Sequence, residues 1–285
     1  MKEKVCIITG ANAGIGKSTT IEIAKMGATI VMVCRNQQKA EKAREEIIQQ
    51  SGNTNIEIFL CDFAEQVQIK TIAQQLVQHY PTIDVLINNA GFISASKTRE
   101  VTQEGIEKTV AVNHLGYFML TNLLKPSLLN SKAARVVNVS SEAHRFINFD
   151  IENINIEKGY TPMNAYSLSK LLNIHFTLAL AQRLEGTNIT TNALHPGIVK
   201  TNFSSNLSGF MNLMFLMAKP FMINADSGAE TSIYLASSPE VANVTGKYFA
   251  KKKQKRPNND AQNLEYANKV WEVSTQWVQL EGQTF

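Results

Sequence analysis

The chain of 285 residues contains only three cysteines and five histidines. The cysteines, Cys6, Cys34 and Cys61, lie far apart in apolar runs and form no CxxC pair. This pattern argues against a disulfide framework and indicates reduced core residues in a compartment such as the cytoplasm. The histidines show neither ligand spacing nor an HExxH motif, so we expect no catalytic metal.

A run of apolar residues long enough to cross a membrane is also missing. The most apolar segment, residues 210–223, is interrupted by Asn212, Lys219 and Pro220, whereas a membrane-spanning helix needs about 20 apolar residues. The first strand-like run begins at Lys4, which leaves no room for a signal peptide. We therefore expect a cytoplasmic chain without a transmembrane segment, while a peripheral membrane contact at the apolar segment stays open.

No large excess of charge of either sign is present, since the formal net charge is +4. A mild positive charge is compatible with an anionic small molecule as a ligand. One basic run, residues 251–256, is either a nucleic-acid or lipid patch or a solvated turn before the C-terminal helix. No aromatic stacking platform accompanies the run, so we favour the turn and expect no nucleic-acid partner.

Apolar strand-like runs alternate with segments of helical period along almost the whole chain. Val- and Ile-rich runs with helices between them are typical of a parallel sheet covered on both faces. No Gly-, Ser- or Pro-rich linker divides the chain, so we predict one doubly wound α/β domain over residues 1–285, with about seven strands. The expected strands are residues 4–9, 28–34, 56–61, 85–88, 135–139, 189–194 and 246–249, and the expected helices include 14–26, 37–50, 66–79, 102–129, 165–185 and 261–277.

A glycine-rich turn, TGANAGIG at 9–16, follows the first strand-like run and opens a helix. Its spacing is GxxxGxG, and the glycines allow a tight turn that lets backbone N–H groups approach a pyrophosphate. A glycine-rich turn without a ligand is the alternative, but the strand before it and the helix after it favour a dinucleotide. The expected phosphate-binding residues are Gly10, Asn12, Ala13, Gly14, Ile15, Gly16 and Lys17.

The end of the second strand-like run indicates which dinucleotide is bound. A site that prefers NAD places an acid there, where it accepts a hydrogen bond from the ribose 2′-hydroxyl. This chain has Arg35 instead and no acid until Glu41, and Lys17 adds a second cation after the glycines. Guanidinium and ammonium groups suit a 2′-phosphate, so we expect NADP(H) to be preferred over NAD(H).

Further polar residues stand where the third and fourth strand-like runs end. Asp62 closes the third run, and Asn89, Ala90 and Gly91 follow the fourth. Ligands of open α/β sheets bind beyond the carboxyl ends of the strands. Asp62 could accept a hydrogen bond from an adenine amino group, and the small residues would let a nucleotide pass close. A role in forming turns is the alternative at each position.

Tyr166 and Lys170 lie four residues apart in a segment of helical period. On one helix face their Cβ atoms would be roughly 5–6 Å apart. An ammonium group there stabilises a phenolate and lowers the tyrosine pKa from about 10, so the tyrosine could exchange a proton near neutral pH. Chance also produces this spacing, and Tyr248 and Lys252 form a second pair with it. The spacing alone does not decide which pair belongs to a site.

A series of motifs stands in one order along the chain: TGANAGIG at 9–16, Asp62, NNAG at 88–91, NHLG at 113–116, NVSS at 138–141, YSLSK at 166–170 and HPGIVKT at 195–201. Together they resemble the short-chain dehydrogenase/reductase family over essentially the whole chain. The segments ITGANAGIGK, CRN at 34–36, SSEAHRF at 140–146 and TGKYF at 245–249 resemble its retinol dehydrogenase-like branch. The resemblance implies a Rossmann-type NAD(P)-binding domain that interconverts a carbonyl and an alcohol, often on an apolar substrate. We expect no N-terminal membrane anchor of the kind this branch carries.

The resemblance assigns roles to particular residues. Tyr166 matches the family's acid/base tyrosine, and Lys170 matches the lysine that lowers its pKa and binds the nicotinamide ribose. Ser141 matches the serine that binds the substrate oxygen, and Asn113 matches the asparagine that helps to hold a water in a proton relay. Tyr248 falls in the motif of the last strand, so it is not the expected site tyrosine. The loop expected to contact the nicotinamide and the phosphates contains Pro196, Gly197, Ile198 and Thr201, with a plain Pro-Gly turn as the alternative.

Two segments could shape the specificity for a substrate. One is the insert between Ser141 and Tyr166, whose length matches the branch and which contains His144. The other is residues 203–223, rich in Met and Phe, with Phe203 and Phe210 as candidate contacts. Such side chains adapt to irregular apolar shapes, so this segment is either a lid over the substrate, a helix packed on the core or a homodimer contact.

The leading interpretation is an NADPH-dependent carbonyl reductase or alcohol dehydrogenase that acts on an apolar small molecule. An NADP(H)-binding redox sensor is the alternative, and the complete set of catalytic residues argues against it. A dehydratase or epimerase with the same Tyr and Lys would be expected to differ in its glycine spacing and to have a larger C-terminal domain. A nucleic-acid binder rests on the basic run alone.

Overall fold

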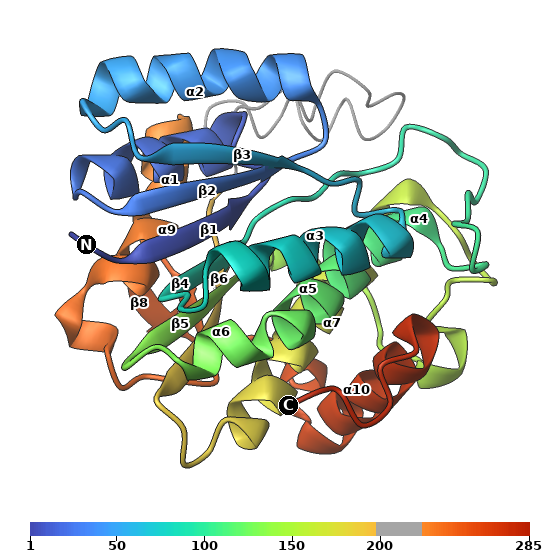
Figure 1. The fold of residues 1–285 in the computed structure, drawn as a ribbon. Helices are drawn as coiled ribbons and strands as arrows, with labels where there is room; N and C mark the ends of the chain where they lie inside the picture. The colour runs from blue at the N-terminus through green and yellow to red at the C-terminus, as the bar shows by residue number, and fades with distance from the viewer. Residues whose placement is uncertain (198–223) are drawn as a thin grey trace.

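In residues 1–197 and 224–285, the part of the chain that the computed structural model describes, eight strands form one sheet (Figure 1). The strand order is β3-β2-β1-β4-β5-β6-β7-β8, and neighbouring strands are parallel except for β7 and β8. The order reverses between β1 and β4, which is where open α/β sheets bind ligands. The strands are β1 (Val5–Thr9), β2 (Thr29–Cys34), β3 (Ile56–Leu60), β4 (Val85–Asn88), β5 (Ala134–Val139), β6 (Ile189–His195), β7 (Lys247–Ala250) and β8 (Lys253–Lys255).

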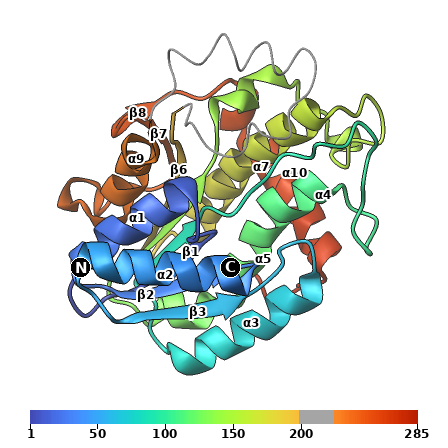
Figure 2. The same ribbon diagram turned by 90° about the horizontal axis from the view of Figure 1, so that it is seen from above.

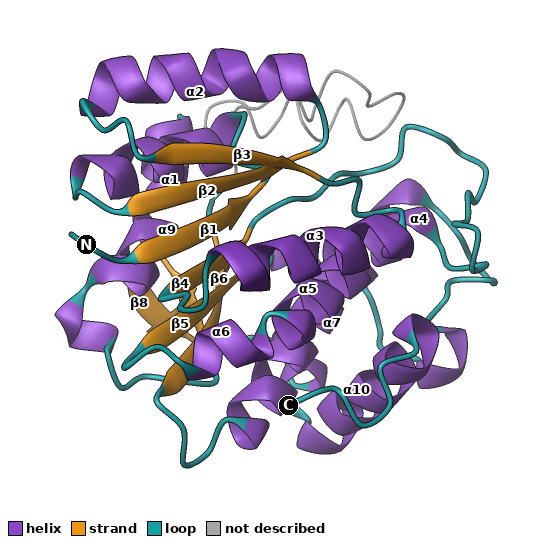
Figure 3. Ribbon diagram, viewed as in Figure 1, coloured by secondary structure: helices purple, strands orange, loops and turns teal. Residues whose placement is uncertain are grey.

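Helices cover both faces of the sheet, as the two views in Figures 1 and 2 show. The helices α1, α2 and α9 lie over one face, and α3, α5, α7 and α10 lie over the other, with loops joining the layers at the sheet edges (Figure 3). The α-helices are α1 (Gly14–Lys25), α2 (Gln37–Ser51), α3 (Gln66–His79), α4 (Lys108–Val110), α5 (Gly116–Leu123), α6 (Lys125–Leu129), α7 (Pro162–Arg183), α9 (Ala225–Ser237) and α10 (Leu264–Val278). The shorter helices are the π-helix η1 (Ala111–Leu115) and the 3-10 helices η2 (Glu142–Phe146), η3 (Ile151–Asn153), η6 (Pro239–Val241) and η7 (Asp260–Gln262).

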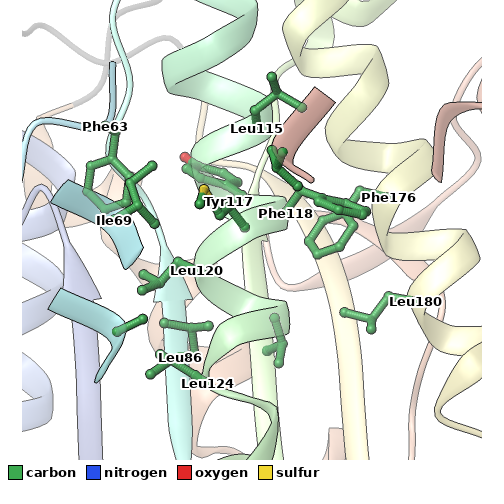
Figure 4. Close-up of a cluster of buried hydrophobic side chains, with 14 of the residues drawn as sticks. Phe63, Ile69, Leu86, Leu115, Tyr117, Phe118, Leu120, Leu124, Phe176 and Leu180 are labelled. Carbon is green, nitrogen blue, oxygen red and sulfur yellow. The ribbon is translucent and has the colours of Figure 1, made fainter. Parts of the chain in front are cut away.

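Alternate residues of the central strands enter two hydrophobic cores. Ile7 of β1 packs in the core under α3, α5, α7 and α10, while Cys6 and Ile8 pack in the core under α1, α2 and α9. Strands buried on both faces are apolar at every position, which explains the continuous Val and Ile runs of the sequence. Figure 4 shows the first core between α5 and α7, where the ring centroids of Phe118 and Phe176 lie 5.6 Å apart.

The predicted fold class, a doubly wound α/β domain, is confirmed, but the single helix expected over residues 102–129 is wrong. Val101 and Glu107 form an isolated antiparallel bridge, so the segment between them is not helical. The helix begins only where the Glu107 carboxylate accepts a hydrogen bond from the backbone N of Val110 at 2.8 Å. The π-helix η1 then interrupts the α-helical pairing, and Pro126 at the start of α6 separates that helix from α5.

The sheet has one strand more than the seven predicted. Lys251 and Lys252 both adopt positive φ angles, of 51° and 59°, and form a tight turn that pairs β8 with β7. The run of residues 251–256, predicted to be a solvated turn, is therefore a turn followed by a short exposed edge strand. The three polar residues of β8 have no apolar period from which a strand could be predicted. Lysine is common on edge strands, where its charge discourages pairing with another chain.

Candidate active site

The turn between β1 and α1 lets a ligand approach its backbone closely. Gly10 has a φ of +67°, and a Cβ atom there would lie 3.0 Å from the Cα of Ala90, while a Cβ on Gly16 would collide with the carbonyl of Gly10. The residue before α1, Ala13, provides no capping side chain, and the first turn of the helix contains no acid. Its first N–H groups are therefore available to an anion, which fits the pyrophosphate of a dinucleotide. The other predicted phosphate contacts lie on either side of Ala13: Asn12 precedes it, and Gly14, Ile15 and Lys17 stand at the start of α1.

Asn89 joins this turn to the end of β4. Its side-chain Nδ2 donates hydrogen bonds to the carbonyls of Thr9 at 2.8 Å and Gly10 at 3.4 Å. In return, Oγ1 of Thr9 accepts from the backbone N of Asn89 at 2.8 Å and of Ala90 at 2.9 Å. These bonds hold the two predicted nucleotide-binding loops together at the point where the strand order reverses.

The two cations expected to select the cofactor each have a carboxylate beside them. The guanidinium of Arg35, at the end of β2, lies 3.7 Å from Asp62, and its side chain is 75% exposed. The ammonium of Lys17 lies 2.5 Å from Glu46 of α2, and this contact lowers the pKa of Glu46. Both pairs are accessible to solvent and therefore weak, so a phosphate can compete for either cation.

Tyr166 and Lys170 lie on one face of α7, with Ser141 beside them after the end of β5. The partly buried side chain of Tyr166 forms a hydrogen bond with the side chain of Ser141. Lys170 is only 4% exposed, and its Nζ lies 5.6 Å from the ring centroid of Tyr166. The same Nζ donates a hydrogen bond to the carbonyl of Val139 at 3.0 Å. The fold thus brings three of the four predicted catalytic residues together.

The pKa of Tyr166 does not move in the direction that the spacing predicts. Burial raises the pKa of Tyr166 to about 12, and the hydrogen bond with Ser141 offsets this rise only in part. Burial also lowers the pKa of Lys170 to about 7. The predicted lowering of the tyrosine pKa by the lysine is therefore wrong for these two side chains, because removal from water disfavours the charged form of both groups. At neutral pH the tyrosine is therefore protonated and can donate its proton.

The fourth predicted residue, Asn113, lies in η1 and is fully buried. Its Oδ1 accepts from the backbone N of Phe92 at 2.9 Å, and its Nδ2 donates to the carbonyl of Phe92 at 2.9 Å and to Oγ of Ser169 at 3.0 Å. A Cβ atom on Gly91 would lie 3.1 Å from Oδ1 of Asn113 and 3.6 Å from Nζ of Lys170. Gly91 therefore lies between the side chains of Asn113 and Lys170, and a glycine there leaves room for both.

His144 lies behind Ser141 and is fully buried. Its Nδ1 is 2.6 Å from the carbonyl of Ser141, and its Nε2 accepts a hydrogen bond from the backbone N of Asn258 at 3.4 Å. Its ring meets that of Tyr248 edge-on, with the centroids 5.2 Å apart. With both ring nitrogens bonded to backbone groups, His144 supports the turn that carries Ser141.

The second tyrosine–lysine pair is not a functional couple. The hydroxyl of Tyr248 donates to a carboxylate oxygen of Glu142 at 3.0 Å, whereas the ammonium of Lys252 lies 2.9 Å from Glu230. Each side chain thus has a separate carboxylate partner. Equal spacing in the sequence leads to different environments because Lys252 stands in the β7–β8 turn and Tyr248 within the sheet.

The loop after β6 is described only in its first residues, Pro196 and Gly197, which stand at the carboxyl edge of the sheet. Within the described ranges, 1–197 and 224–285, no helix is both long and apolar enough to span a bilayer. The remaining candidates of this loop and of the predicted lid, residues 203–223, lie outside the described residues: Ile198, Thr201, Phe203 and Phe210.

The family model of the short chain dehydrogenases matches residues 4–212. This chain belongs to that family. As a member it is an oxidoreductase that acts on CH–OH groups with a nicotinamide cofactor. The fold and the order of the site residues described above agree with this assignment.

The relatives of this dehydrogenase confirm its resemblance to the retinol dehydrogenase-like branch. Retinol dehydrogenase 14 of Homo sapiens is 39% identical over 98% of this chain and 88% of its own length. A solved structure of an uncharacterised protein from Mycobacterium paratuberculosis is 31% identical, with a TM-score of 0.77 over 98% of this chain and 94% of that chain. A short chain dehydrogenase from Escherichia coli, solved as a complex with NADPH, shares the fold at 23% identity, with a TM-score of 0.69 over 89% of this chain and 98% of that chain.

Three residues of this dehydrogenase to which the sequence motifs assigned no role contact the predicted site residues. Thr9 fastens the two nucleotide-binding loops, and Glu46 pairs with Lys17. Asn173, one turn after Lys170 on α7, donates to the backbone of both η1 and β5. Thr9 stands directly before the first glycine, Glu46 lies on the neighbouring helix α2, and Asn173 follows Lys170 by three residues. Nothing in the sequence assigns these positions a role, so only the three-dimensional contacts identify them.

Proposed function

We propose that this chain is an NADP(H)-dependent oxidoreductase that interconverts an aldehyde or ketone with an alcohol on an apolar substrate, with Tyr166 as the acid/base. The observation that carries the proposal is the hydrogen bond of Tyr166 to Ser141 beside the buried Lys170. The hydroxyl groups of Tyr166 and Ser141 are close enough to bond to each other, so both can form hydrogen bonds with one substrate oxygen. They stand at the sheet edge that also carries the glycine-rich turn.

The proposed chemistry follows from the states of these side chains. In reduction, the protonated Tyr166 gives its proton to the substrate oxygen, and Ser141 donates a hydrogen bond to the same oxygen. Lys170 supplies positive charge close to the phenolate that forms, and Asn113 helps to hold the surrounding polar groups. In oxidation the same groups act in reverse. The nicotinamide, when bound, supplies or accepts the hydride.

The preference for NADP(H) is supported by Arg35 and Lys17. Arg35 stands at the end of β2 with most of its side chain in solvent, where a ribose 2′-phosphate can form a bidentate contact. Lys17 stands in the first turns of α1, next to the predicted pyrophosphate site. The nearest acid, Asp62, lies beside Arg35, so it can hold the guanidinium in place and accept from the adenine.

The proposed substrate is an apolar carbonyl or alcohol, since the relatives of this chain are named retinol dehydrogenases. Pro196, Gly197, Ile198 and Thr201 remain the proposed nicotinamide loop, and residues 203–223 remain the proposed lid. All three cysteines are free and buried, which fits a reducing compartment such as the cytoplasm.

The proposal is tested with NADPH or NADH and a panel of decanal, retinaldehyde and an aromatic ketone. We expect turnover with NADPH and a preference over NADH that Arg35→Ala reduces about 10- to 100-fold, since a charge-assisted hydrogen bond contributes about 1.5–3 kcal/mol. Lys25→Ala, which removes an exposed cation at the other end of α1, is the control and should leave the preference unchanged. An unchanged preference in Arg35→Ala would contradict the cofactor assignment. Tight NADPH binding without turnover of any carbonyl would favour the redox-sensor alternative.

A further inference from the structure

The buried side chain of Asn173 connects the two backbone segments that flank the proposed catalytic residues. It lies one turn after Lys170 on α7 and is fully buried. Its Nδ2 donates to the carbonyl of Asn113 in η1 at 3.0 Å and to the carbonyl of Val139 at the end of β5 at 3.3 Å. The carbonyl of Val139 also accepts from Nζ of Lys170 at 3.0 Å. One amide group therefore shares an acceptor with Lys170 and holds the backbone of Asn113.

His114, the residue after Asn113 in η1, connects this turn to α10. Nε2 of His114 lies 2.9 Å from Oγ of Ser274 on α10. His114 is fully buried, which lowers its pKa to about 3. A neutral imidazole has one donor and one acceptor nitrogen. Nδ1 of His114 and Oδ1 of Asn173 are both buried, and neither atom has a hydrogen-bond partner among the described residues.

This arrangement matters because η1 is a π-turn. A π-turn is less stable than the α-helix it interrupts and persists where other contacts hold it. Without the Asn173 amide, the carbonyl of Asn113 would lose a buried donor, and the carbonyl of Val139 would keep only Nζ of Lys170. A relaxed turn would move the Asn113 side chain away from Ser169 and Phe92.

We propose that Asn173 is a positioning residue for the reductase reaction, with its amide holding η1 and the end of β5 in the geometry that places Asn113 and Lys170 around Tyr166. This inference rests on the proposed function. The contact of His114 with Ser274 also joins η1 to the C-terminal helix α10.

The decisive comparison is between Asn173→Leu and Asn122→Leu. Asn122 is an equally buried asparagine, 2% exposed, whose Nδ2 donates to the carbonyl of Phe118 at 2.8 Å and whose Oδ1 accepts from the backbone N of Phe285 at 3.0 Å. Both substitutions remove a buried amide and lower the melting temperature. Only the first one removes hydrogen bonds to the carbonyls of Asn113 and Val139.

We expect Asn173→Leu to lower kcat for NADPH-dependent reduction of retinaldehyde about 10- to 100-fold, because misplacement by about 1 Å can cost that much. The Kd for NADPH, measured by fluorescence, should change much less than kcat, since the glycine-rich turn is untouched and Nζ of Lys170 keeps the carbonyl of Val139 as its acceptor. Hydrogen exchange of the peptide 108–115 should become faster in Asn173→Leu than in Asn122→Leu. Asn122→Leu should keep kcat within about twofold of the wild type. Equal kcat values in the two variants would overturn the proposal.

Asn173→Asp keeps the size of the side chain and serves if the leucine variant does not fold. An ionised carboxylate donates no hydrogen bond and lies near Lys170, so it should raise the pKa of that lysine. We expect a lower kcat and an alkaline limb of the pH–rate profile that moves to higher pH. An unchanged kcat and profile would contradict the positioning role. Tyr166→Phe in the same assay separates the two proposals. If Tyr166→Phe loses turnover while the Asn173 variants keep it, only the positioning role of Asn173 is contradicted. If Tyr166→Phe retains turnover, the proposed function is contradicted.

Discussion

At the scale of single residues, Lys170 is a buried cation of the site that several contacts hold in place. It is 4% exposed, it donates to the carbonyl of Val139, and its ammonium lies 5.7 Å from the ring of Tyr117 and 5.6 Å from that of Tyr166. Burial lowers the pKa of Lys170 to about 7. Its charge is therefore lost within the physiological range of pH.

We predict that the affinity for NADPH falls as the pH rises through 7. The ammonium of Lys170 is the proposed donor to the nicotinamide ribose, and it is present below pH 7 and lost above it. The weakening should reach up to about tenfold for each pH unit above 7. Fluorescence titrations between pH 6 and 9 measure this dependence.

The control for this prediction is Lys170→Met, which should bind NADPH more weakly and with little dependence on pH. The same slope in the variant and the wild type would show that another group is responsible. A flat wild-type profile would contradict the lowered pKa.

The sequence was sufficient to predict which residues gather at the site, but not their ionisation. Tyr166, Lys170, Ser141 and Asn113 were all predicted from motifs in one order, and the fold brings them together. The pKa directions depend on how completely tertiary structure removes each group from water, which the spacing of two residues does not contain. Asn173 was missed for the same reason, since its contacts are with segments far away in the sequence.

At the scale of secondary-structure elements, α10 closes the face of the sheet that carries α5 and α7. Trp271 of α10 meets Phe118 edge-on with ring centroids 4.8 Å apart and stacks on Phe176 at 5.9 Å. The guanidinium of Arg183 lies 4.2 Å above the Trp271 ring. These contacts hold α10 against the helix that carries the proposed catalytic pair.

Trp271→Ala is predicted to lower the free energy of unfolding by about 3–5 kcal/mol, because it leaves a cavity among buried aromatic rings. Urea unfolding followed by circular dichroism measures the loss. Trp277→Ala removes a partly buried ring from the same helix and should cost less than half as much. Equal losses in the two variants would argue against the aromatic contact between α10 and the core.

Long periodic elements were predictable, while interruptions within them were not. The helix over residues 66–79 and the strand over 85–88 were predicted with the observed bounds. The helix over 102–129 was predicted as continuous because its apolar period continues through η1, but a π-turn inserts one residue without disturbing that pattern much. The backbone of η1 accepts a hydrogen bond from Asn173, and the apolar period of the sequence does not contain such a contact.

At the scale of the whole molecule, the two cores and the sheet enclose histidines that must stay neutral. Burial lowers the pKa of His114 to about 3 and the pKa values of His175 and His195 to about 4. In the unfolded chain each histidine has a pKa of about 6.5. Below that value the unfolded state binds protons that the folded state does not, so stability is present above pH 6.5 and lost as the pH falls towards 4.

We predict that the free energy of unfolding falls by about 1.4 kcal/mol per pH unit for each of these histidines between pH 6.5 and 5. For the three together, the slope is about 4 kcal/mol per pH unit. Urea unfolding at pH 7.5, 6 and 5 measures this slope. His175→Gln keeps a donor for the carbonyl of Asp260, which Nε2 of His175 now meets at 2.9 Å, and should remove about a third of the slope. The same stability at pH 5 and pH 7 would contradict the prediction.

The central claim is that Tyr166 transfers the proton of a carbonyl reduction, and Tyr166→Phe tests it most directly. Tyr117→Phe is the matched control, because the Tyr117 ring lies at nearly the same distance from Lys170 but belongs to the core. With NADPH and retinaldehyde, Tyr166→Phe should lower kcat about 10²- to 10⁴-fold while it still binds NADPH, and Tyr117→Phe should keep its turnover. Turnover in Tyr166→Phe within a few-fold of the wild type would contradict the claim.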